Sequence, residues 1–67
     1  MIQTESLQKI MAKNNITARI LAEKLGMSES LFSKKINNES PMTLTQAKNI
    51  CDLLGIPSKK MQVIFFA

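Results

Sequence analysis

The 67-residue sequence predicts an all-α domain built from five short helices. Apolar residues recur at helical spacing along most of the chain, and asparagine pairs, glycines and prolines interrupt them at short intervals. No segment alternates polar and apolar residues over the length of a half-buried strand, and only Val63–Phe66, with its β-branched and aromatic side chains, allows a short terminal strand. The length predicts one domain, residues 1–67, and a hydrophobic content of 45% suffices for a packed core.

The first predicted helix covers about residues 4–14, and the second covers about residues 17–25. Asn14–Asn15 ends the first helix, because asparagine tolerates the left-handed conformation that ends helices. Thr17 is a good N-cap for the second helix, and Gly26 supplies the left-handed residue that a tight turn requires. The apolar faces consist of Leu7, Ile10 and Met11 in the first helix and of Leu21, Ala22 and Leu25 in the second.

The third predicted helix begins at Ser28, a strong N-cap, and ends at Asn37–Asn38. Glu29 in its first turn is favourable to the helix dipole. Phe32 and Ile36 lie four residues apart and face the core, so the opposite face of this helix is expected to point outward.

Ser40–Pro41 places a loop before the fourth helix, because proline is not tolerated inside a helix. The fourth helix is expected over residues 43–54, with a capping box at Thr43–Gln46 and Gly55 at its end. Residues 56–58 open a last, shorter helix. The residues expected to be buried are Leu44, Ala47, Ile50, Cys51 and Leu54 in the fourth helix and Met61, Ile64 and Phe65 in the last.

The composition excludes several classes of function. The chain has no histidine and a single cysteine, Cys51, so it forms no intramolecular disulfide, no four-ligand zinc site and no histidine general base. Nothing in the sequence suggests an enzyme, a cofactor or a small-molecule ligand. No stretch approaches the ~20 apolar residues of a membrane span, and residues 1–9 do not resemble a signal peptide. A free cysteine without an export signal predicts a reducing cytoplasm.

Nine Lys and Arg against five Asp and Glu give a net charge of +4. The positive excess favours a polyanionic partner, with nucleic acid ahead of an anionic membrane surface. Solubility is a plainer explanation of the same charge. Since the basic residues are dispersed over several helices, a membrane-surface role is the weakest of these readings.

The segment from Ile16 to Asn38 carries the most specific signal. Two short helices are joined by the tight turn Leu25–Ser28, and Ala22 next to the core residue Leu21 permits close approach of the second helix. A glycine turn lets such a pair cross steeply and leaves one face of the second helix free. This is the helix-turn-helix arrangement, in which the second helix enters the DNA major groove while the first crosses the phosphate backbone.

Residues Thr17–Ser28 resemble the helix-turn-helix core of the Cro/cI (lambda-repressor-like, XRE-type) regulators, where Leu-Ala-x-x-Leu-Gly-hydrophobic-Ser recurs. The resemblance implies a compact five-helix lambda-repressor-like DNA-binding domain with its helix-turn-helix at about residues 17–38, which binds double-stranded DNA in a bacterial cytoplasm or nucleoid. Leu54–Ile56 continues the family pattern. The segments similar to small phage and prophage repressors are Leu31–Asn38, Met42–Leu44 and Phe65–Phe66.

The sequence departs from the family pattern at three places. Ala18 stands where many relatives carry a phosphate-binding Gln, a contact that Thr17 or the helix N-terminus would have to replace. Ile36–Asn38 stands where many relatives have Glu-Asn-Gly. Glu29 stands at a position that commonly holds Gln, and phosphates repel its carboxylate unless it accepts a hydrogen bond from a cytosine amino group.

The resemblance places the base-contacting positions at Glu29, Ser30, Ser33 and Lys34. Lys34 is the strongest candidate, because lysine commonly contacts O6 and N7 of guanine. The predicted contacts to the DNA backbone, which set position and not sequence, are Thr17, Ser28, Lys35, Asn37 and Asn38.

Each of these residues also has a purely structural interpretation. Lys34–Lys35 and Lys59–Lys60 can be solvated faces, Ser28 a helix cap, and Glu29 a first-turn acid that favours the helix dipole. Cys51 lies between core positions and is interpreted as a small buried hydrophobe.

Phe65 and Phe66 predict a partner surface. Two adjacent side chains point to different faces of a helix or strand, so one phenylalanine is expected to be exposed in a monomer. We therefore expect a homodimer through the last element, at least on DNA, with its two recognition helices about 34–36 Å apart.

The predicted function is that of a phage or prophage Cro/cI-like repressor, a transcriptional regulator that acts by occupying operator DNA. The alternative is a helix-turn-helix protein-interaction module that binds another regulator, which Ala18 and Glu29 favour. Salt dependence separates the two, because a DNA-binding protein loses affinity with a log–log slope of about −0.9 per neutralised phosphate.

Overall fold

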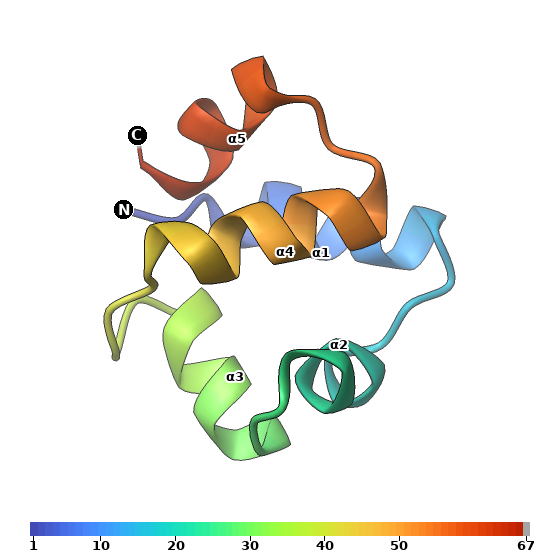
Figure 1. The fold of residues 1–67 in the computed structure, drawn as a ribbon, viewed down its shortest axis with the longest axis vertical. Coiled ribbons are helices and arrows are strands. Elements are labelled where there is room, and N and C mark those ends of the chain that lie inside the picture. Colours follow the sequence, from blue (N-terminus) through green and yellow to red (C-terminus); the bar gives the residue numbers. More distant parts are fainter. Residues whose placement is uncertain (67) are drawn as a thin grey trace.

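A computed structural model describes residues 1–66, which fold into five α-helices. They are α1 (Thr4–Lys13), α2 (Ala18–Leu25), α3 (Glu29–Ile36), α4 (Leu44–Leu54) and α5 (Ser58–Phe65). In Figure 1, α4 crosses the middle of the view, α5 lies on one side of it, and the α2–α3 pair lies on the other. The predicted all-α fold is confirmed, and residues 63–65 belong to α5, so the alternative of a terminal strand is wrong.

Local sequence signals begin and end these helices as predicted. Thr17, Ser28 and Thr43 are the N-caps of α2, α3 and α4, and each side-chain oxygen accepts a hydrogen bond from a first-turn N–H. The predicted capping box is present, because Gln46 also accepts from the backbone N–H of Thr43 at 3.1 Å. Gly55 ends α4 at φ +70°, in the left-handed region.

One hydrophobic core takes side chains from all five helices. Its fully enclosed members are Leu7, Leu21, Phe32, Ala47 and Ile50, each with no exposed surface. The apolar faces predicted for α1 and α2 lie against this core, with Ile10 and Leu25 partly buried at its edge.

Leu44 corrects the buried face predicted for α4. Its side chain is 54% exposed, whereas Ala47, Ile50, Cys51 and Leu54 are buried. Leu44 is the first residue of α4, and the buried stripe begins one turn later, so helical spacing alone assigned it to the core.

No helix within residues 1–66 has both the length and the apolar character needed to cross a membrane.

Candidate nucleic-acid interface

The turn between α2 and α3 is fixed by Gly26. This residue has φ +72°, and the N–H of Met27 donates to the carbonyl of Ala22 at 3.0 Å, the bond that closes a Schellman motif. A Cβ placed on Gly26 meets no atom within 4 Å, so the turn requires glycine for its dihedral angle and not for space. Among the helix pairs, α2 and α3 have the most extensive contact, and Ala22 of α2 is 1% exposed.

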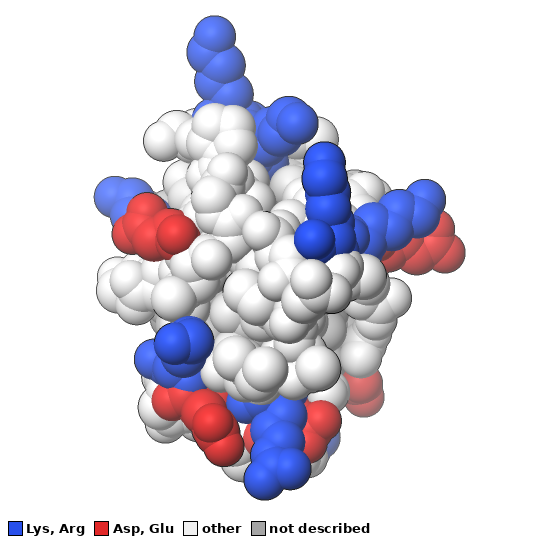
Figure 2. Space-filling view, turned by 90° about the vertical axis from the view of Figure 1, so that its right-hand side faces the viewer, with Lys and Arg blue, Asp and Glu red and all other residues white. Residues whose placement is uncertain are grey.

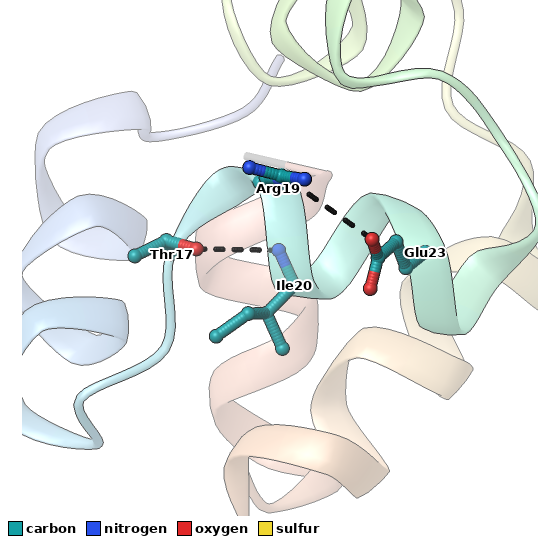
Figure 3. A network of polar contacts seen from close by, with 4 residues as sticks. All are labelled: Thr17, Arg19, Ile20 and Glu23. Carbon is teal, nitrogen blue, oxygen red and sulfur yellow. Dashed lines mark hydrogen bonds and ion pairs between the residues drawn. The ribbon is translucent and has the colours of Figure 1, made fainter.

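The N-caps of α2 and α3 can serve DNA as well as the fold. The hydroxyl oxygen of Thr17 accepts from Ile20 N at 3.2 Å, and that of Ser28 accepts from Leu31 N at 3.1 Å (Figure 3 shows the first). Both residues are exposed. Because a cap uses only the oxygen as acceptor, each hydroxyl proton remains able to donate to a phosphate oxygen.

The outward face of α3 agrees with the predicted geometry. Phe32 and Ile36 are buried, while three of the four predicted base-contacting residues are exposed and the fourth is half-buried. The exposed ones are Glu29, Ser30 and Lys34, and the half-buried one is Ser33. The three exposed side chains therefore lie on the part of α3 that the rest of the protein leaves uncovered, and Ser33 lies at its edge.

Sequence analysis missed Leu31, which is 40% exposed on the same helix. It precedes the core residue Phe32 and follows Ser30, so it lies beside the outward face and not opposite it. A helical projection from Phe32 and Ile36 would have found it, because residue 31 falls about a sixth of a turn from the outward direction. An apolar side chain at this position can contact the methyl group of thymine.

Lys35 lies in a different environment from the one predicted for a DNA-backbone contact. Its side chain is only 8% exposed, and its ammonium group donates to the carbonyl oxygen of Pro41 at 2.7 Å. Phe32 and Ile36 are the other buried residues of α3, and the long aliphatic stem of Lys35 is buried as well. This geometry removes Lys35 from the set that can reach a phosphate, because its charge is directed into the loop after α3.

The side-chain amides of Asn37 and Asn38 have different hydrogen-bond partners, although both residues were predicted to contact the DNA backbone. Asn37 is exposed, and its amide nitrogen donates to the carbonyl of Ser33 at 2.9 Å within α3. The amide of Asn38 is directed to the N-terminal segment, where it pairs with the backbone of Ile2 at 2.8 and 3.1 Å. The amide of Asn38 therefore makes its hydrogen bonds within the protein, although the residue is exposed, whereas Asn37 lies on α3's exposed end without such a long-range contact.

The charged side chains of this protein are spread out. Figure 2 shows a face on which basic and acidic groups are interspersed around a broad uncharged area. In Figure 3, Arg19 extends from the first turn of α2 toward Glu23, with Nε and Oε1 at 4.0 Å and side chains 77% and 72% exposed. Such an exposed pair contributes little stability, so Arg19 remains available to a phosphate, a role that sequence analysis did not assign.

Three other residues singled out in the sequence, Phe65, Phe66 and Cys51, lie outside this interface. Phe65 is 2% exposed and Phe66 is 45% exposed, so one member of the pair is buried and the other faces solvent, as expected.

Cys51 is buried in α4, and burial, aided by the charge of Asp52, raises the pKa of its thiol.

Comparison with known proteins agrees with this geometry. A family model described as the Cro/C1-type HTH DNA-binding domain matches residues 6–57, which cover α2, α3, α4 and most of α1. No curated protein and no solved structure matches the chain significantly.

Proposed function

The chain belongs to the Cro/C1-type helix-turn-helix DNA-binding domain family, and from this membership we propose that it is a sequence-specific regulator that acts by occupying an operator. The observation that carries the proposal is the uncovered polar face of α3, held outward by the Gly26 turn. Inserted in the major groove, that face brings hydrogen-bonding side chains to base edges. Occupancy alone then blocks or adjusts a promoter, as in a phage or prophage repressor.

Base contacts are assigned to Glu29, Ser30, Ser33 and Lys34. The Lys34 ammonium is suited to O6 and N7 of guanine, and the Glu29 carboxylate to a cytosine amino group. The serine hydroxyls both donate and accept, so they fit either base edges or phosphate. Leu31 joins this set as an apolar contact to thymine.

Backbone contacts are assigned to Thr17, Ser28 and Asn37, with Arg19 added from the structure. Thr17 and Arg19 lie at the start of α2, and Ser28 caps α3, so these three donors lie where two helix N-termini offer favourable dipoles for phosphate, whereas Asn37 lies at the C-terminal end of α3. Ala18 is partly buried against the core, so Thr17 and Arg19 on either side of it would replace its missing amide contact.

A homodimer is proposed through the exposed edge of α5. Phe66 is 45% exposed and Val63 is 64% exposed, and they lie three residues apart. Sedimentation velocity on the wild type and Phe66→Ala, with and without DNA, tests this. Dimerisation that Phe66→Ala weakens and that the exposed α4 substitution Leu53→Ala leaves intact supports the interface, whereas a strict monomer on DNA refutes it.

The experiment that tests the function is selection from random duplex DNA by the purified protein at about 150 mM salt, where non-specific binding is weak. Enrichment of one sequence supports the operator-binding regulator, and an enriched palindrome fixes the half-site spacing. No enrichment, together with a shallow salt dependence, favours the protein-interaction module that Glu29 on α3 and Ala18 on α2 allow.

A further inference from the structure

The first residues of the chain form a short strap across the C-terminal end of α3. The backbone N–H of Ile2 donates to Oδ1 of Asn38 at 2.8 Å, and Nδ2 of Asn38 donates to the carbonyl of Ile2 at 3.1 Å. The side-chain amide thus pairs with both polar groups of one residue, as a neighbouring strand would. We call residues 2–4 the N-terminal strap.

Two more hydrogen bonds hold the strap at other points. The hydroxyl of Thr4 donates to the carbonyl of Ile36 at 2.5 Å, and the backbone N–H of Gln3 donates to the carbonyl of Ile64 at 2.6 Å. The side chain of Ile2 is 6% exposed and belongs to the core. The strap therefore ties the last turn of α3 to α5, across 32 to 36 residues of sequence on the α3 side.

The position of α3 depends on few elements. Its main helical neighbour is α2, which lies at its N-terminal side across the Gly26 turn. At the other end of α3, the carbonyls of residues 33–35 accept from backbone N–H groups of the following turn, and the carbonyl of Ile36 is left without such a backbone partner within residues 1–66. The strap supplies a partner for the Ile36 carbonyl, through Thr4, and pairs with the next turn, through Asn38.

We propose that Asn38 is a positioning residue: through the strap it fixes the orientation in which α3 enters DNA. The inference rests on the proposed function of α3 in base recognition. Base contacts require side chains in a defined geometry, whereas attraction to phosphates tolerates small rotations of the helix. Loosening the strap therefore lowers specific affinity more than non-specific affinity.

The backbone of Asn38 allows a test in which the two possible roles of this residue predict different results. Asn38 has φ +64°, a left-handed conformation in which glycine is less strained than asparagine. A residue needed only for this turn would be replaced by glycine without loss. A residue needed for the strap would lose both of its hydrogen bonds to Ile2 on the same replacement.

Asn15 is the matched control. It has φ +55°, also left-handed, and its side chain makes no hydrogen bond within the described residues 1–66. Asn15→Gly therefore changes the backbone preference alone, whereas Asn38→Gly changes the backbone preference and removes the strap contact.

The experiment measures binding of each full-length variant to the selected operator duplex and to a scrambled duplex, together with amide exchange at Ile2 and Leu21. For Asn38→Gly we expect about tenfold weaker operator binding, because restoring the α3 geometry on the operator then costs a free energy comparable to that of the lost hydrogen bonds, with little change on the scrambled duplex. Exchange should accelerate at Ile2 and not at the core residue Leu21. Asn15→Gly should match the wild type in every measurement.

Asn38→Asp provides the intermediate case, because a carboxylate still accepts from Ile2 N but cannot donate to its carbonyl. Operator affinity should fall in the order Asn, Asp, Gly at residue 38. Operator binding by Asn38→Gly equal to that of the wild type would overturn the positioning role. So would an equal loss on both duplexes with faster exchange at Leu21, which indicates general destabilisation. If the wild type enriches no DNA, the proposed function fails first and the positioning role fails with it.

Discussion

The ammonium group of Lys35 lies 2.7 Å from the carbonyl oxygen of Pro41, although these residues belong to a helix and to the loop that follows it. Lys35 is the one charged residue buried among residues 1–66. Its neighbour Lys34 is exposed on the same helix. Two adjacent lysines therefore have separate tasks: one closes a loop inside the protein, and the other remains available to a partner.

Lys35→Ala should lower the free energy of unfolding by on the order of 2 kcal/mol, because it removes a charge-assisted hydrogen bond and the packing of a buried aliphatic stem. Lys35→Met, which keeps most of the stem, should cost less. Urea denaturation measures both, and the exposed α4 residue Lys48 provides the control through Lys48→Ala. Unchanged stability of Lys35→Ala would show that the contact to Pro41 contributes nothing in solution.

Lys34→Ala should leave stability unchanged and weaken operator binding by about 1–3 kcal/mol, since a lysine contact to guanine has that value. Selection from random duplexes should then show relaxed preference at one base position. The control is Lys48→Ala, which should alter neither affinity nor preference. Equal losses on operator and scrambled duplexes would instead assign Lys34 to the phosphate backbone.

Leu31→Ala should reduce affinity for operators that carry a thymine within its reach. The decisive measurement replaces each thymine of the operator in turn by uracil, which lacks the methyl group. At one position the wild type should lose about fourfold in affinity, corresponding to roughly 0.8 kcal/mol for one buried methyl group, and Leu31→Ala should lose nothing there. If the wild type and Leu31→Ala lose the same affinity at every thymine-to-uracil replacement, Leu31 does not contact a thymine methyl group.

Interactions between near neighbours in the sequence were predictable. The caps at Thr17, Ser28 and Thr43 and the glycine turn at Gly26 depend on residues within one helical turn, so the sequence pattern specifies them directly. The uncovered face of α3 followed from Phe32 for the same reason. These local signals account for the fold class and for most of the candidate interface.

The roles of Lys35 and Asn38 were not predictable in this way. A lysine next to an exposed lysine has the composition of a solvated face, and only the path of the following loop brings the Pro41 carbonyl to its ammonium group. The partner of Asn38 lies 36 residues away in sequence. No local pattern encodes either contact, because each depends on how the helices pack together.

Cys51 should react slowly with thiol reagents at pH 7.5 in the folded protein and rapidly in urea. Its side chain is 5% exposed, and burial, with the negative charge of Asp52 as a second cause, raises the pKa of the thiol. Because the folded pKa exceeds the unfolded one, the folded state holds this proton more tightly. The contribution of this proton to the free energy of unfolding is fully present below the unfolded thiol pKa, about 8.5. It is lost as pH rises through the folded pKa.

This linkage can be isolated with Cys51→Ala, which removes the thiol and keeps a small apolar side chain. Urea denaturation of both proteins at pH 7.5 and pH 9.5 isolates the contribution of the thiol, because the two proteins share every other side chain. The stability difference between wild type and variant should shift in favour of Cys51→Ala at the higher pH. A constant difference, or rapid labelling of the native protein at pH 7.5, would mean that the thiol is accessible in solution and titrates at its ordinary pKa.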